Sequence, residues 1–218
     1  NDFSNIKSII SIVEGISKYN EDFLDKLFSS VDLNTSIIGG GAGFIENKSP
    51  VIFDNKGFYS NSAIIVKMKK EIEVGVKHGC KYLSGPYVAT SCTNNILKKI
   101  DYSDAFELYK KIIREDSSLV LTPKNFSDIA KNYPIGIVKY NSEQIVRDPI
   151  NIIDGKLVLV GDIKENSLIN ILKVDKISML KASKEAANES IKKDSNLVFI
   201  FDCASRVNYL QDHFNEEL

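Results

Sequence analysis

Residues 86–113 read PYVATSCTNNILKKIDYSDAFELYKKII and decide the local fold. Two apolar, β-branched runs flank SCTNN, which is typical of two strands joined by a turn. The segment that follows opens with Ser103, the predicted N-cap, has Glu107 a turn later, and keeps helical spacing to about Arg114. The stretch therefore predicts a pair of strands followed directly by a helix.

The chain before residue 86 adds a helical segment and a strand-rich segment. Apolar residues recur every three or four positions over residues 4–32, which predicts one or two helices. Residues 37–41 form a short apolar strand that runs into three glycines. Residues 51–79 alternate with the period of two expected of strands, with DNKG at 54–57 as a turn. The short connections favour antiparallel pairing, because a parallel pair needs a long crossover.

The chain after residue 114 continues this mixture of helices and strands. The pattern predicts a short helix at 125–131, strands over 135–173, a long helix at 174–193, a buried strand at 196–201 and a final helix at 204–218. We therefore predict an α+β protein of two strand-rich, largely antiparallel lobes covered by helices. The predicted division between the lobes falls between residues 115 and 116.

The composition excludes several classes of partner. The 28 Lys and Arg residues nearly balance the 29 Asp and Glu residues, for a formal net charge of -1, so nothing favours nucleic acid or an anionic membrane. No apolar run approaches the roughly 20 residues of a membrane helix, and the N-terminus lacks the features of a signal peptide. Three widely spaced cysteines fit a reducing compartment, so we expect a cytoplasmic protein.

Several motifs occur in the order known from one protein family. They are IIGGGAG at 37–43, GFYSNSAIIVKM at 57–68, VGVKHGC at 74–80 with the strands and helix that follow it, VRDPI at 146–150, GDIKENSLINILK at 161–173 and LVFIFDCASR at 197–206. Together they resemble the FIST domain family, whose members occur in sensory proteins and in some F-box proteins. The resemblance extends over most of the chain, from about residue 37 to residue 206.

The resemblance implies a FIST N-type lobe at 1–115 and a FIST C-type lobe at 116–218. Family members generally carry more chain at both ends of this series, so we expect the C-terminal portion of the first lobe and a truncated second lobe. The chain is then either an abbreviated member or a fragment of a longer sensor. The family implies a non-catalytic sensing module of a signal-transduction protein, with an amino acid or a derivative of one as ligand. The sequence itself shows only sites that could hold an anion, so another anionic metabolite is the other ligand expected. The expected partner is a signalling output domain or another protein. The alternative is a platform for protein–protein interaction, as in F-box members.

His78 and Cys80 are the first chemical candidates, since a neighbouring histidine can stabilise a cysteine thiolate. No third group that would orient the histidine is evident in the sequence, and a glycine turn does not fix the approach of the two side chains. We therefore expect no catalysis. The simpler interpretation is a strand end at which Gly79 takes a positive φ and His78 hydrogen-bonds a neighbouring backbone group.

The glycines Gly39, Gly40 and Gly41 are the second candidate. They lack the Lys-Ser/Thr of a phosphate-binding loop and the G-x-G-x-x-G pattern, so we predict a tight turn, with at least one positive φ, that brings the backbone close to another segment. Backbone amides in such a turn could face a ligand carboxylate. The cysteines and the two histidines show no metal-ligand spacing, so neither a metal nor another cofactor is expected.

The segment FDCASR at 201–206 is the third candidate. A buried strand that ends at Asp202 and Cys203, followed by Arg206 in the first turn of a helix, would present a thiol, free amides and a guanidinium at one edge. This edge suits an anion, and Arg206 could equally pair with Asp202 as a structural tie. The resulting hypothesis is a ligand site between the two lobes, formed by Gly39, Gly40, Gly41, His78, Gly79, Cys203 and Arg206.

Overall fold

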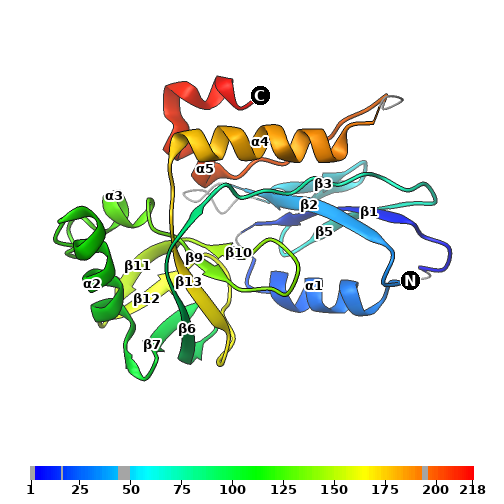
Figure 1. The fold of residues 1–218 in the computed structure, drawn as a ribbon. Coiled ribbons are helices and arrows are strands. Elements are labelled where there is room, and N and C mark those ends of the chain that lie inside the picture. Colours follow the sequence, from blue (N-terminus) through cyan, green and yellow to red (C-terminus); the bar gives the residue numbers. More distant parts are fainter. Residues whose placement is uncertain (1–2, 16, 44–49, 193–195) are drawn as a thin grey trace. The chain divides into compact units, whose positions relative to one another are not determined.

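A computed structural model describes residues 3–15, 17–43, 50–192 and 196–218 (Figure 1). The chain forms two compact units. The first comprises Asn1–Gly75 and Asn188–Cys203, and the second comprises Val76–Ala187 and Ala204–Leu218. The chain therefore passes between the units three times, after Gly75, after Ala187 and after Cys203. Helices form 27% and strands 33% of the structure, which confirms the α+β class.

The first unit contains a three-stranded sheet in the order β2-β1-β5. The central strand β1 (Ser8–Glu14) pairs in parallel with β2 (Ser36–Ala42) and antiparallel with β5 (Ala63–Met68). Figure 1 shows α1 (Asn20–Ser29) lying along one face of this sheet. The helix predicted from residue 4 is therefore wrong over β1. Four consecutive residues from Ser8 are buried, so both faces of this central strand are covered. A strand covered on both faces does not need to alternate apolar and polar residues, and its sequence therefore lacks the period of two by which strands are predicted.

The DNKG turn of the first unit is confirmed. It joins β3 (Ile52–Asp54) to β4 (Gly57–Tyr59), and Asp54 Oδ1 accepts hydrogen bonds from the amides of Lys56 at 2.7 Å and Gly57 at 3.2 Å. The strand predicted over 71–79 is wrong, because these residues have no regular secondary structure. Their alternating apolar residues lie in the connection that leads from the first unit to the second.

The second unit contains an eight-stranded antiparallel sheet in the order β10-β9-β13-β6-β7-β12-β11, with β8 paired to β7. Strands β6 and β7, from the stretch quoted first, lie in its middle. The bounds are β6 (Lys81–Thr93), β7 (Ile96–Ile100), β8 (Ser103–Asp104), β9 (Ile135–Ile137), β10 (Ile145–Arg147), β11 (Pro149–Ile153), β12 (Lys156–Leu159) and β13 (Leu168–Lys173).

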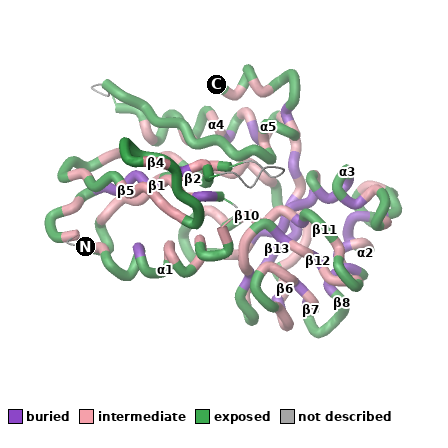
Figure 2. Tube along the Cα trace, turned by 180° about the vertical axis from the view of Figure 1, so that it is seen from behind, coloured by how far each residue is buried: buried purple, intermediate pink, exposed green. Residues whose placement is uncertain are grey.

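Helix α2 (Ala105–Ser117) packs on β7 and β12 and supplies much of the core of the second unit. Its N-cap is Asp104 and not Ser103, because the Asp104 carboxylate accepts the amide of Glu107 at 3.1 Å. Helix α3 (Phe126–Ala130) contacts β11. Figure 2 shows the buried residues gathered in these helices and the sheet. The buried face of α2 consists of Ala105, Phe106, Tyr109, Ile112 and Ile113.

The C-terminal region contains α4 (Lys176–Ser190), α5 (Ala204–Leu210) and the 3-10 helix η1 (Gln211–Glu216). Helix α4 confirms the long helix predicted at 174–193. The buried strand predicted at 196–201 is wrong, because these residues have no regular secondary structure and every side chain from Leu197 to Phe201 is at least 36% exposed. A core-like composition does not form a strand unless another strand pairs with it.

Candidate functional site

The turn at His78–Cys80 is packed against α4. Gly79 has φ +71, which confirms the positive φ predicted there. A Cβ at Gly79 would lie 2.9 Å from both Ala182 Cβ and the Ser178 carbonyl oxygen, so glycine is needed for space as well as for backbone conformation. The Cys80 amide donates to His78 Nδ1 at 2.9 Å, which confirms that His78 hydrogen-bonds a neighbouring backbone group.

The other ring nitrogen of His78 contacts a carboxylate. Nε2 lies 3.1 Å from Glu143 Oε2. Because Nδ1 accepts the Cys80 amide, the neutral ring carries its proton on Nε2 and donates it to Glu143. Burial lowers the pKa of His78; the Glu143 charge opposes this, and the charges of Arg206 and Lys77 lower it further. The imidazole is therefore neutral at pH 7.

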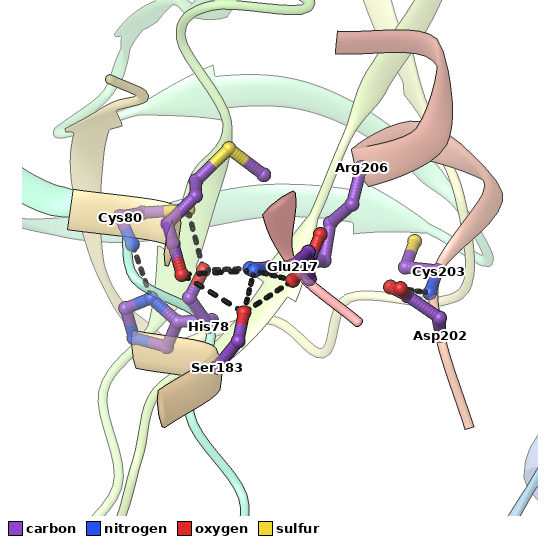
Figure 3. Close-up of polar contacts among 8 residues, drawn as sticks. His78, Cys80, Ser183, Asp202, Cys203, Arg206 and Glu217 are labelled. Carbon is purple, nitrogen blue, oxygen red and sulfur yellow. Dashed lines mark hydrogen bonds and ion pairs between the residues drawn. The ribbon is translucent and has the colours of Figure 1, made fainter. Parts of the chain in front are cut away.

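Arg206 in α5 is held by several groups of the second unit (Figure 3). Nη1 donates to the His78 carbonyl at 2.9 Å, and Nη2 donates to the Met179 carbonyl at 3.0 Å and to Ser183 Oγ at 2.9 Å. Nε donates to Glu217 Oε1 at 2.8 Å, and Nη2 also pairs with that oxygen. The Arg206 and Glu217 side chains are only 13% and 6% exposed. We call these five residues the Arg206 cluster.

This geometry argues against catalysis by Cys80 and His78. A base that activates a thiol must face it, but His78 Nδ1 faces the Cys80 amide. The Cys80 Sγ lies 3.8 Å from the His78 carbonyl oxygen. Glu143 supplies the third group that is not evident in the sequence, yet it holds the imidazole in an orientation that does not present a nitrogen to the thiol.

A shallow polar hollow of about 410 Å³ lies beside His78. The Lys77 ammonium lies 3.4 Å from the Glu143 carboxylate, so the hollow carries one cation and one anion. Gln144 Oε1 accepts from Asn170 Nδ2 at 3.0 Å, which ties the loop to strand β13. The remaining side chains offer uncharged hydrogen-bond donors and acceptors. The lining consists of Lys77, His78, Asn141, Ser142, Glu143 and Gln144.

The three glycines lie in strand β2 of the first unit. The predicted turn is wrong, since the described backbone has no positive φ at these positions. The predicted close approach is confirmed. A Cβ at Gly39 would lie 1.7 Å from the Ser11 carbonyl oxygen of β1, and one at Gly41 would lie 2.7 Å from Gly15 Cα. The glycines thus allow two backbones to lie together.

The predicted site residues are distributed over both units. The structure brings His78, Gly79 and Arg206 together in the second unit. Cys203 belongs to the first unit, as the three glycines do, and its amide donates to Asp202 Oδ1 at 2.7 Å. Arg206 pairs with the mostly buried carboxylate of Glu217. The site composed of all seven residues stays a prediction.

Four residues that matter here were not predicted: Lys77, Glu143, Ser183 and Glu217. Sequence patterns could not find them, because residues that contact one another here lie far apart in the chain. Arg206, for example, is 128 positions from His78 and 23 from Ser183. Each is an ordinary polar residue in its own segment. Of the four, only Lys77 lies within one of the motifs quoted from the sequence, VGVKHGC at 74–80, where it directly precedes His78.

Two other features are absent from the described ranges. Among those residues, no group of three or more His, Cys, Asp or Glu side chains is arranged to hold a metal ion. No helix in the described part of the chain combines the length and the apolar character needed to cross a bilayer.

Fold and site define a two-unit α+β protein whose second unit joins a polar hollow to a mostly buried ion-pair cluster. The chain matches the FIST N domain over residues 3–103 and the FIST C domain over residues 105–218, so it belongs to the FIST family, as the resemblance predicts. FIST domains are sensory domains of signal-transduction proteins. No match was found among curated proteins or among solved structures.

The two matched segments contribute to one sheet. Strands β6 and β7 fall in the FIST N segment, yet β6 pairs with β13 and β7 pairs with β12, which both fall in the FIST C segment. The compact units therefore follow the hydrogen-bonded sheet and not the family segments. The division of the chain between residues 115 and 116 stays a prediction.

Proposed function

We propose that this chain is a non-catalytic sensing module that binds a small molecule, an amino acid or another anionic metabolite, in the hollow beside His78. The observation that carries the proposal is the hollow itself. Its volume of about 410 Å³ falls within the range of about 300–1,000 Å³ that is usual for ligand pockets. Membership of a family of sensory domains supports the same conclusion.

The lining suggests how such a ligand would bind. Lys77 would pair with a carboxylate, and Glu143 would pair with the ammonium group of an amino acid. These two side chains lie 3.4 Å apart, so a zwitterion would exchange one ion pair for two. Neutral His78 would contribute its Nε2 proton. Arg206 would act indirectly, because it binds the carbonyl of His78 and so holds the turn that forms one wall.

A ligand screen with a matched pair of variants tests this proposal. The twenty amino acids and a set of small carboxylic acids would be added to the purified protein, and Tm would be measured by calorimetry. We expect at least one compound to raise Tm. Lys77→Ala should weaken its binding by about tenfold or more, since a charge-assisted hydrogen bond is lost.

The control is Lys111→Ala, which removes an ion-paired lysine from the exposed surface of α2. It should bind the compound as the wild type does. The proposal is wrong if no compound in the screen raises Tm, or if Lys77→Ala and the wild type have the same affinity.

One observation favours the alternative, a protein-interaction platform. Residues 197–201 are apolar, exposed and without regular secondary structure, and such a segment can pair with a strand of a partner protein. Cross-linking mass spectrometry would show links from this segment to one identified protein. These links should be lost in Ile200→Glu and kept in Ile177→Glu, which changes an exposed isoleucine of α4. Equal patterns in both variants would contradict the platform.

A further inference from the structure

His78 makes polar contacts through both ring nitrogens and through its carbonyl oxygen. The ring accepts the Cys80 amide at Nδ1, at 2.9 Å, while Nε2 faces Glu143 at 3.1 Å. The carbonyl of the same residue accepts Arg206 Nη1 at 2.9 Å. One residue thus connects the turn, the loop at 141–144 and helix α5.

Protonation of the ring would break one of these hydrogen bonds. The only nitrogen that can take a second proton is Nδ1, because Nε2 already carries one. Once protonated, Nδ1 is a donor that faces another donor, the Cys80 amide. The Cys80 amide would lose its acceptor, and the turn that Gly79 packs against α4 would be free to change its backbone conformation.

The charged groups around His78 do not compensate for this loss. Glu143 favours the imidazolium, whereas Lys77 and Arg206 disfavour it. The Arg206 charge is itself paired with Glu217. The atoms of α4 nearest the turn, from Met179, Ala182 and the Ser178 carbonyl, carry no formal charge. Attraction to Glu143 is therefore opposed by burial and by two cations.

The direction of the His78 pKa shift fixes the sign of the effect. Burial is the main cause that lowers the pKa of folded His78 below the value of 6.5 for a free histidine. The neutral ring therefore stabilises the folded turn fully above pH 6.5. This stabilisation is lost as the pH falls through the lower pKa of the folded state.

Along the chain, residues of the turn and of the Arg206 cluster lie close to each of the three passages between the units. His78 follows the passage after Gly75, Ser183 precedes the passage after Ala187, and Arg206 follows the passage after Cys203. These three residues are joined through the Arg206 guanidinium. The guanidinium therefore links residues that precede or follow each of the three passages along the chain.

We propose that His78 is a proton-operated latch: the neutral ring holds the His78–Cys80 turn against α4 and the Arg206 cluster, and protonation at Nδ1 releases it. The latch would regulate the segments that connect the units. It does not require a ligand in the hollow, so it stands or falls separately from the sensing proposal.

The test uses the full chain and its only two histidines, His78 and His213. In His78→Asn, the side-chain oxygen can accept the amide two residues on and does not titrate, so this variant should hold the turn at every pH. His213→Asn is the matched control, because His213 is exposed and contacts Glu216. Hydrogen exchange of the Cys80 amide, corrected for the intrinsic pH dependence, would be followed from about pH 8 to about pH 4.5.

In the wild type and in His213→Asn we expect protection of the Cys80 amide to fall by about tenfold as His78 becomes protonated, which corresponds to the loss of one hydrogen bond. Protection in His78→Asn should stay constant. An equal loss in His78→Asn would overturn the proposal. If that variant does not fold, NMR titration of the wild type decides. A His78 ring with a proton on Nδ1 at pH 7, or a Cys80 amide that stays protected while His78 titrates, would refute the latch.

Discussion

Arg206 Nη1 donates to the carbonyl oxygen of His78 at 2.9 Å, although the two residues are 128 positions apart in the chain. The guanidinium also binds Glu217, a carboxylate that is only 6% exposed. This arginine is therefore part of the structure of the second unit, and the His78 turn depends on it.

Arg206→Ala should strongly destabilise the protein. It would leave the Glu217 carboxylate buried without its cation and would remove the donor of the His78 carbonyl, at a cost of about 3 kcal/mol in the free energy of unfolding. Denaturant titration measures this. Arg114→Ala, at an exposed position of α2, should cost less than about 0.5 kcal/mol. An Arg206→Ala protein as stable as that control would show that the cluster does not hold the turn.

Gly79→Ala and Gly155→Ala separate two costs of adding a methyl group. Both glycines have positive φ, +71 and +73, but Gly155 has no atom within 4 Å of its added Cβ, whereas Gly79 has three at 2.9 Å. We expect Gly155→Ala to cost about 1 kcal/mol from backbone strain alone. Gly79→Ala should cost about 1–3 kcal/mol more, because the turn must move away from α4. Equal changes in Tm would contradict the observed packing.

Gly39→Ala and Gly40→Ala test the close approach of β1 and β2. A Cβ at Gly39 would overlap the backbone of Ser11, which cannot move without breaking the parallel ladder. A Cβ at Gly40 would meet only side-chain atoms of Phe201, Cδ1 at 3.3 Å and Cβ at 3.9 Å. Calorimetry should show a loss of about 2 kcal/mol or more for Gly39→Ala and less than about 1 kcal/mol for Gly40→Ala. The reverse order would rule out this register.

Alkylation should rank the cysteines by environment. Burial is the main cause that raises the pKa of Cys92 from 9.0 to about 11, with Glu165 acting in the same direction and Lys98 opposing it. Its thiolate fraction near pH 8 is therefore roughly a hundredfold below that of an ordinary thiol. Exposed Cys203 should react first with iodoacetamide, and Cys92 should react slowly. Peptide mapping that finds Cys80 reacting much faster than free cysteine would reopen the question of catalysis.

The sequence alone predicted those elements whose signals are local. Strands β6 and β7 are marked by apolar runs on either side of a turn, and the DNKG turn by its own residues. Helix α2 is marked by apolar periodicity and by a capping residue at its start. The positive φ of Gly79 was also predicted from the sequence, since glycine is the residue that favours positive φ in a turn. The order of motifs also predicted the family, which both matched segments show.

Only the tertiary structure decided the features that depend on distant neighbours. Residues 8–14 have helical spacing but form a strand, because β2 and β5 supply hydrogen bonds on both sides. Residues 196–201 have the composition of a core strand but no regular structure. Arg206 forms an ion pair with Glu217 and donates a hydrogen bond to the carbonyl oxygen of His78. Pairing and burial are set by segments that meet only after folding, and no local pattern records which segments these are.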